Sequence, residues 1–179
     1  HEHLVTSSNS AGSPTRRVLG IDPGLTITGW GVVDGDGSAA TAVEYGVIRT
    51  KTKSSRAERL GQIAEGVRAL IREHEPAELA VEQQFVAVNV RSAMVIGEAR
   101  AAAMVAAADC AIPVFEFAPT AVKEAVTGWG GAPKEQVQQM VMVQLGLVEL
   151  PEPLDISDAL AIALTRLGEL RLELAMARS

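Results

Sequence analysis

The sequence predicts an α/β fold with a mixed five-stranded sheet flanked by helices on both faces. Two observations support this prediction. The hydrophobic patterns occur in the order β-β-β-α-β-α-β-α-α-α, and the first three strands are joined by short turns whereas the later ones are separated by helices. The chain has 179 residues, of which 47% are hydrophobic but only 3% aromatic. This length suits one compact domain, whose core must be filled mainly by aliphatic side chains.

The first third of the chain predicts an antiparallel meander. Residues 17–22 form an apolar run typical of a buried strand, and a Pro-Gly turn follows in which Gly24 is expected to adopt a positive φ. Residues 28–33 and 42–50 have the pattern of two further strands, and the Asp-Gly-Asp-Gly sequence at 34–37 is a strong hairpin signal. Such short connections join neighbouring antiparallel strands.

The rest of the chain alternates predicted helices with short strands. Apolar residues between Leu60 and Ile71 recur at spacings of three and four, which predicts a helix that Pro76 ends. Short strands are predicted at 79–82 and 112–117, and the first of them should run parallel to strand 17–22 because a helix precedes it. Further helices are predicted at 91–109, 119–127, 133–145 and 155–175. This order matches the ribonuclease-H-like architecture.

The composition favours a cytoplasmic protein without a membrane segment. No apolar run approaches the ~20 residues that a membrane helix needs, and the single cysteine, Cys110, cannot form an internal disulfide. Residues 1–15 are polar and rich in serine, and we interpret them as an expression remnant or a disordered lead before a single domain at 16–179. The net charge of −6 argues against a general nucleic-acid coat, but a local basic surface could still meet phosphates.

Four carboxylates are the candidate catalytic residues. Asp22 and Glu82 end two predicted strands, and if these strands are neighbours both side chains emerge at the edge where open α/β sheets bind ligands. Asp155 and Asp158 are three residues apart at the start of the last helix, which places them on one face. Clustered carboxylate oxygens suit Mg²⁺ or Mn²⁺ rather than zinc. Paired ions of this kind can activate water and stabilise the leaving oxygen of a phosphate.

Each carboxylate also has a structural explanation when it is taken alone. Asp22 precedes a Pro-Gly turn, where aspartate is common, and Glu82 could be a solvated strand end. Asp155 is a good helix N-cap, and Asp158 would then occupy a position that the helix dipole favours. If the fold brings the four carboxylates together, the catalytic interpretation is favoured over these structural explanations.

Three motifs resemble those of the RuvC family of crossover junction endodeoxyribonucleases, which resolve Holliday junctions. The first is GIDPGLT at 20–26, followed by Gly29 and Gly31; the second is VEQQF at 81–85; the third is DISDALAIA at 155–163. The motifs occur in the family's order and spacing, and the similarity covers residues 17–170.

The resemblance implies a bacterial, homodimeric resolvase that makes paired symmetric nicks in four-way junction DNA during recombination and repair, together with the branch-migration complex. It also implies a two-metal site that holds Mg²⁺, with Mn²⁺ as a possible substitute, and that is built by Asp22, Glu82, Asp155 and Asp158. Some members of the family have histidine at the position of Asp155. The DNA contacts that we expect from the resemblance are Phe85, Asn89, Arg91, Lys123 and Lys134.

Several of these assignments have alternatives. Lys123 and Lys134 could be solvated surface lysines, and Phe85 could cap the core rather than stack on a base opened at the junction. Helix 91–109 is apolar on nearly all its faces. This pattern fits a central core helix, or a helix that packs on the sheet with one face and on a symmetry mate with the other.

Three other functions compete with the junction nuclease. The segment 22–26 also fits the phosphate loop of actin-like ATPases and sugar kinases, but those proteins need two such domains and this chain is too short for two. A non-catalytic DNA-binding scaffold would not need clustered carboxylates that repel one another. The third alternative is a nuclease that acts on a different branched DNA.

Overall fold

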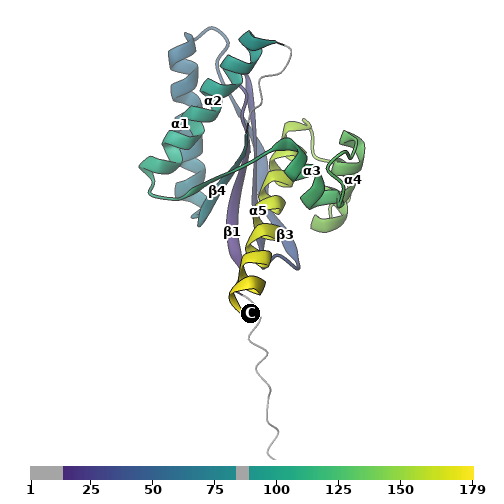
Figure 1. Cartoon of the computed structure of the whole chain (residues 1–179). Helices are drawn as coiled ribbons and strands as arrows, with labels where there is room; N and C mark the ends of the chain where they lie inside the picture. The colour runs from purple at the N-terminus through teal and green to yellow at the C-terminus, as the bar shows by residue number, and fades with distance from the viewer. Residues whose placement is uncertain (1–13, 84–88) are drawn as a thin grey trace, which may run out of the picture.

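The computed structural model describes residues 14–83 and 89–179, and its elements follow the predicted order (Figure 1). The strands are β1 (Arg16–Asp22), β2 (Ile27–Gly35), β3 (Ala40–Arg49), β4 (Glu78–Glu82) and β5 (Val114–Phe117). The helices are α1 (Arg56–His74), α2 (Val90–Asp109), α3 (Pro119–Thr127), α4 (Lys134–Leu145) and α5 (Asp155–Ala177). The order β-β-β-α-β-α-β-α-α-α is therefore confirmed.

The five strands form one mixed sheet in the order β3-β2-β1-β4-β5. β1 and β3 each pair with β2 in antiparallel register, whereas β4 lies parallel to β1 and β5 parallel to β4. The predicted mixed sheet and the parallel pairing of the first and fourth strands are confirmed. Ile21 is the register partner of Val81, so the next residues, Asp22 and Glu82, end their strands at the same edge of the sheet.

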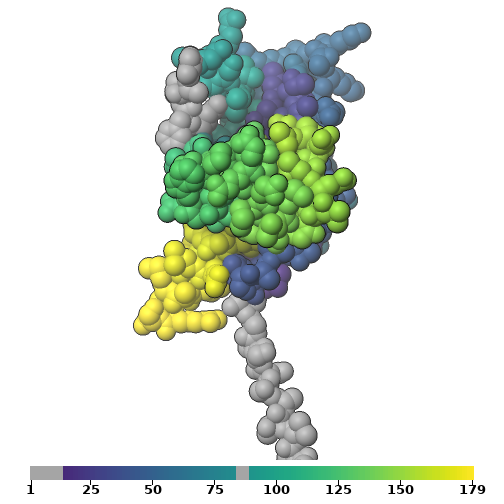
Figure 2. All heavy atoms as spheres, turned by 90° about the vertical axis from the view of Figure 1, so that its right-hand side faces the viewer, coloured from purple at the N-terminus to yellow at the C-terminus, as the bar shows by residue number. Residues whose placement is uncertain are grey.

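Helices cover both faces of the sheet, and the alternation of side chains along the strands divides the core into two layers. Ile21 and Val81 belong to the cluster that packs with α1 and α2, whereas Val18 and Ala80 belong to the cluster that packs with α5. Figure 1 shows α1 and α2 on one side of the strands and α3, α4 and α5 on the other. In the turned view of Figure 2, α3 and α4 form the outer surface of the second layer, and the end of α5 emerges below them.

Glycines on β1 and β2 allow the backbone of α5 to lie directly on the sheet. A Cβ on Gly20 would overlap the carbonyl oxygen of Ala159, and a Cβ on Gly29 would overlap the carbonyl oxygen of Asp155. Any larger residue at these two strand positions would push the helix away. The contact therefore fixes how closely the first turn of α5 approaches the end of β1.

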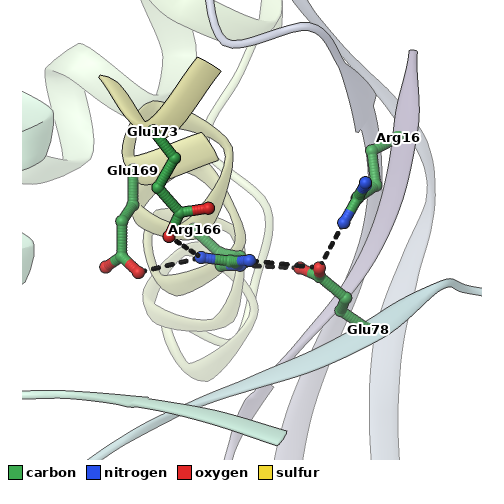
Figure 3. Close-up of polar contacts among 5 residues, drawn as sticks. All are labelled: Arg16, Glu78, Arg166, Glu169 and Glu173. Carbon is green, nitrogen blue, oxygen red and sulfur yellow. Dashed lines mark hydrogen bonds and ion pairs between the residues drawn. The ribbon is translucent and has the colours of Figure 1, made fainter. Parts of the chain in front are cut away.

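A buried ion-pair network holds the second half of α5 against the other end of the sheet (Figure 3). The Arg166 guanidinium donates to both carboxylate oxygens of Glu78, at 2.7 and 3.1 Å, and each side chain is only 3% exposed. Arg16 donates to the same carboxylate at 2.6 Å, and Arg166 also donates to Glu169 and Glu173. Because a buried charge that lost its partner would cost about 3–5 kcal/mol, the network strongly favours one position of α5 along the strands.

The prediction of a positive φ at Gly24 is wrong. The glycines with positive φ lie elsewhere in the described residues. Glycine is needed at position 24 because a Cβ there would overlap the carbonyl oxygen of Ile27. The turn is closed by the Thr28 hydroxyl, which donates to the Gly24 carbonyl at 2.8 Å.

The interpretation of α2 as a central core helix is also wrong. Its buried residues are four alanines on the side that packs on α1 and the sheet, namely Ala99, Ala103, Ala106 and Ala107. Its larger side chains are partly exposed: Val90 by 60%, Met94 by 62%, Ile96 by 38% and Val105 by 53%. Although α2 is rich in apolar residues, none of the described helices is long and apolar enough to cross a bilayer.

Substitution of Gly20 tests the close packing of α5. Gly20→Ala should destabilise the protein by about 1–3 kcal/mol, because the new methyl group overlaps a helix backbone that cannot move without strain. Gly168→Ala is the control, since a Cβ at this exposed position of α5 meets nothing within 4 Å and should stabilise the helix by about 0.5–1 kcal/mol. Urea unfolding measures both changes. Equal stability of the two variants would contradict the packing described.

Candidate active site

Asp22 and Glu82 are placed by adjacent parallel strands. Each ends its strand, and each follows a fully buried residue that packs toward α1 and α2. Because side chains alternate along a strand, the carboxylates of Asp22 and Glu82 turn to the opposite face, which α5 covers. Both residues are half-buried.

Asp155 and Asp158 occupy the first turn of α5, where the helix dipole favours carboxylates. The helix begins after Leu154, whose side chain makes no capping hydrogen bond. Asp155 is therefore the first helical residue and not the N-cap that its structural explanation required. The backbone of Asp155 covers Gly29, the register partner of Asp22, so the two pairs of carboxylates meet at one edge of the sheet.

The charges of the four carboxylates affect one another. Burial, together with the charges of Asp158, Asp155 and Glu82, raises the pKa of Asp22 from 3.8 to about 8. Burial and the charge of Asp158 likewise raise the pKa of Glu82, and burial is the largest cause that raises the pKa of Asp158. Four acids from three separate elements thus share one partly desolvated place, which disfavours their charged forms.

This site suits divalent cations bound by oxygen. All four candidate ligands are carboxylates, which are the donors that Mg²⁺ and Mn²⁺ prefer. Among the described residues, no three of the four bring oxygens within 4.8 Å of one another, but burial and mutual repulsion disfavour their charged forms. A divalent cation would relieve this repulsion, so the donor set fits the Mg²⁺ predicted from the sequence.

Lys123 and Lys134 lie beside the carboxylates, around a hollow of about 450 Å³. The hollow is lined by Glu82 and Asp158 from the acidic cluster and by the two lysines from α3 and α4. The Lys134 ammonium is 3.5 Å from the Oδ2 atom of Asp158. The charges of both lysines oppose the rise in the pKa of Glu82. The structure therefore brings these two residues to the candidate site, although their contact with DNA stays a prediction.

A second hollow, of about 580 Å³, borders Asp155. It is lined by Asp155, by the turn residues 24–27 and by Arg91 in the first turn of α2. Arg91 is exposed. The acidic cluster is thus bordered by two hollows, each of which carries at least one basic residue.

The other two predicted DNA contacts belong to the segment between β4 and α2. Asn89 is the N-cap of α2, and its side chain accepts a hydrogen bond from the backbone N–H of Ser92 at 3.2 Å. Its observed role is capping, and a DNA contact by its remaining polar atoms stays a prediction. Phe85 lies outside the described residues.

Two ion pairs that shape the site were not predicted from the sequence. Lys134 was predicted to contact DNA or to be a solvated surface lysine, whereas the structure pairs it with Asp158. The buried pair of Arg166 and Glu78 was also missed, although a signal existed: Arg166 interrupts a long apolar stretch of α5, and Glu78 directly precedes the apolar core of β4. A charge inside an apolar run predicts a buried partner.

The fold and the acidic cluster together have the arrangement of ribonuclease-H-like nucleases. Residues 18–166 match the family model described as crossover junction endodeoxyribonuclease RuvC. This chain belongs to the RuvC family of crossover junction endodeoxyribonucleases. It is 48% identical over 148 residues to the RuvC of Chloroflexus aggregans, covering 83% of this chain and 90% of the relative. It is 46% identical over 149 residues to the RuvC of Brevibacillus brevis, with the same coverage of 83% and 90%.

Solved structures agree with this assignment. The structure of Thermus thermophilus RuvC in complex with a Holliday junction substrate is similar with a TM-score of 0.84 and 39% identity, covering 88% of this chain and 96% of that one. The yeast mitochondrial Holliday junction resolvase has a TM-score of 0.65 at 14% identity, covering 95% and 86%, and shows the shared fold alone. The predicted ribonuclease-H-like fold class is confirmed.

Asp22→Asn should stabilise the cation-free protein, because the amide keeps the shape but removes one of four clustered charges. The folded state holds the Asp22 proton up to its raised pKa of about 8, whereas the unfolded chain loses it near 3.8. The wild type therefore loses stability as the pH rises between these values, and the advantage of Asn grows over the same range. Thermal melting in EDTA should show a higher Tm, at about 2–4 °C per kcal/mol.

The matched control for this prediction is Glu149→Gln, which removes an exposed carboxylate. Its Tm should stay close to that of the wild type at every pH. Added Mg²⁺ should raise the Tm of the wild type more than that of Asp22→Asn. An Asp22→Asn protein that melts like the control at all pH values would show that the four charges do not interact.

Proposed function

We propose that this chain is a Holliday junction resolvase that cuts the backbone of four-way DNA junctions at Asp22, Glu82, Asp155 and Asp158 with the help of Mg²⁺. Membership in the family of crossover junction endodeoxyribonucleases supports the activity. The similar Thermus thermophilus structure, solved with a Holliday junction substrate, supports the choice of DNA. The observation that carries the assignment of the catalytic centre is the convergence of the four carboxylates from β1, β4 and α5.

The four carboxylates would hold two Mg²⁺ ions at the shared edge of β1 and β4. Bound there, the ions would supply the positive charge needed to polarise the scissile phosphate, activate water and stabilise the leaving oxygen. The chain itself contributes the rigidity of the site. Asp22 and Glu82 are fixed by the ends of paired strands, and the first turn of α5 is fixed by its contact with the glycines of the sheet.

The basic residues around the cluster would position the DNA strand. Burial raises the pKa of Asp158, and the nearby charge of Lys134 opposes part of this rise. Lys123 and Lys134 would meet phosphate oxygens in one hollow, and Arg91 would meet the backbone in the other. Phosphate contacts fix the register of DNA without reading its sequence, so these residues should affect affinity for every junction alike.

We also assign the exposed apolar side of α2 to a homodimer interface. Val90, Met94 and Val105 lie on one face of the helix and leave an apolar surface that a second copy would cover. A two-fold dimer would present two sites to opposing strands, as paired symmetric nicks require. The mass in solution tests this assignment. Cooperation with a bacterial branch-migration complex and a cytoplasmic location stay predictions.

The competing functions are less well supported. The family match over residues 18–166 speaks against a phosphotransferase. The four converging carboxylates speak against a non-catalytic scaffold, which would bear their repulsion without benefit. A preference for another branched DNA is an outcome that the cleavage assay itself would reveal.

Removal of a single carboxylate charge should abolish cleavage while junction binding survives. Asp22→Asn, Glu82→Gln and Asp158→Asn should each reduce the cleavage rate by more than the ~10–100-fold that loss of an outer-shell partner costs. Asp155→Asn should retain more activity, because the family accepts histidine there. The measurement is cleavage of a cruciform plasmid with Mg²⁺ and without ATP, in which paired nicks give linear DNA and single nicks give open circles.

The control for the cleavage assay is Glu135→Gln, which removes an exposed carboxylate next to Lys134 in the first turn of α4. It should cleave like the wild type. A variant of Asp22, Glu82 or Asp158 that cuts at the wild-type rate would remove that residue from the catalytic centre. Hydrolysis of ATP without any nicking would favour the phosphotransferase.

Loss of Lys123 or Lys134 should weaken junction binding and flatten its dependence on salt. Each lysine that neutralises a phosphate contributes about 1 to the slope of log affinity against log salt. Binding of Lys123→Ala and Lys134→Ala is measured in EDTA, so that changes in metal binding do not interfere. Arg171→Ala, which removes an exposed charge from the far half of α5, should leave the slope unchanged. If both lysine variants show the wild-type dependence of affinity on salt, the proposal that these lysines bind phosphate is wrong.

A further inference from the structure

A second group of potential metal ligands lies on the face of the sheet opposite to α5. Glu44 belongs to β3, and Glu73 and His74 end α1. One ligand atom from each of the three lies within 4.8 Å of the others, which holds for no other group of three in the described residues. The group is near the start of β1, since Arg17 donates to the His74 carbonyl at 2.9 Å. It is therefore separate from the acidic cluster at the end of β1.

A β-bulge aims Glu44 at α1. The pairing of β2 with β3 skips one residue, Val43, between Ala42 and Glu44. Before the bulge, Ala42 packs with the α5 layer, and after it Ile48 packs with the α1 layer. The extra residue thus reverses the alternation of β3, and Glu44 shares the face of Ile48. A regular strand would have turned Glu44 toward α5.

His74 directs an unpartnered nitrogen into this group. The residue is only 8% exposed, and its Nε2 atom is buried without a hydrogen-bond partner among the described residues. The Oε2 atom of Glu44 approaches it to 3.0 Å without the alignment of a hydrogen bond, and Oε2 of Glu73 lies at 3.9 Å. A buried polar atom without a partner calls for an explanation, and a bound ion is one.

We propose that Glu44, Glu73 and His74 form a binding site for Zn²⁺, distinct from the Mg²⁺ site of the nuclease. Ligands about 2.0–2.2 Å from one zinc ion can be no more than about 4.4 Å apart, and the contacts of His74 Nε2 at 3.0 and 3.9 Å meet this limit. An imidazole nitrogen favours zinc over Mg²⁺. The two carboxylates balance the charge of the ion.

The surroundings leave this group available to a cation. The nearby Arg17 is held by Asp34 through two hydrogen bonds, at 2.8 and 2.9 Å, and by the His74 carbonyl. The ring of Trp30 has its centroid 5.9 Å from that of the His74 ring and borders the site on the side of the sheet. Both glutamates are exposed at 53% and 66% of their side chains, which gives an ion access from solvent.

Zinc at this site would join β3, an edge strand of the sheet, to the end of α1. Its effect would be on stability, because a ligand that binds only the folded state raises the free energy of unfolding. The proposal does not depend on the function of the acidic cluster, and nuclease activity should not require the ion.

The test is a zinc titration in a chain from which the other two imidazoles and two carboxylates of the acidic cluster have been removed. His1 and His3 are the other imidazoles of the sequence, and the acidic cluster is the other place for a cation. The parent protein is therefore the full chain with His1→Gln, His3→Gln, Asp22→Asn and Asp158→Asn. It should bind one Zn²⁺ in calorimetry, and ZnCl₂ should raise its Tm whereas MgCl₂ should not.

Three further variants of this parent decide the proposal. His74→Gln and Glu44→Gln should each lower the affinity for zinc about tenfold or more, and Glu65→Gln, on an exposed part of α1, should leave it unchanged. A parent that binds no zinc, or that binds equally after either ligand substitution, would overturn the proposal. If His74→Gln fails to fold, Glu44→Gln decides, because this exposed side chain lies on an edge strand that tolerates the change.

His74→Gln in the otherwise native chain should still cut junctions with Mg²⁺. This measurement separates the zinc site from the nuclease: loss of zinc binding with full cleavage supports two independent sites. Loss of cleavage by a stably folded His74→Gln protein would contradict the separation.

Discussion

The contact on which the rest of the structure depends is the packing of the α5 backbone on the backbones of β1 and β2. Gly20 and Gly29 lack the side chains that would separate these backbones, and Gly31 leaves room for the side chain of Leu160. This contact sets the distance of the helix from the sheet. The buried pair of Arg166 and Glu78 then sets its position along the strands. Together they bring two carboxylates of a helix to two carboxylates of a sheet.

This geometry has an electrostatic consequence. Burial, and after it the charges of the neighbouring acids, raises the pKa of Asp22, so four acids held together oppose one another's ionisation. We expect such a cluster to weaken the fold unless a cation binds, which is the trade between stability and activity proposed for a catalytic centre. Lys134 offsets only part of the charge, at 3.5 Å from Asp158. The rigid attachment of α5 is what maintains the cluster against its own repulsion.

The sequence predicts most of the fold because the order of its elements follows from local periodicity, which needs no distant partner. The edge shared by Asp22 and Glu82 follows as well, since a helix between two strands implies that they run parallel. The identity of the N-cap before α5 did not follow, because cap preferences favour Asp155 over Leu154, whereas the helix begins after Leu154 with the Asp155 backbone against Gly29.

Other features could not be predicted from the sequence because they depend on contacts between residues that are distant along the chain. Arg166 and Glu78 are 88 positions apart, so their charges look solvated until the fold joins them. Glu44 faces α1 only because a bulge reverses the alternation of side chains along β3. No local sequence pattern predicted this bulge. The apolar surface of α2 was ambiguous because nearly every face of this helix is apolar, and periodicity cannot choose the buried side.

The most direct test of this account is anomalous diffraction from Mn²⁺ in crystals of the wild-type chain bound to a four-way junction. The account predicts a manganese signal contacted by carboxylates from both parts of the fold, Asp22 or Glu82 from the sheet and Asp155 or Asp158 from α5. Manganese bound by the sheet carboxylates alone, or away from all four, would contradict the claim that the docking of α5 completes the metal site.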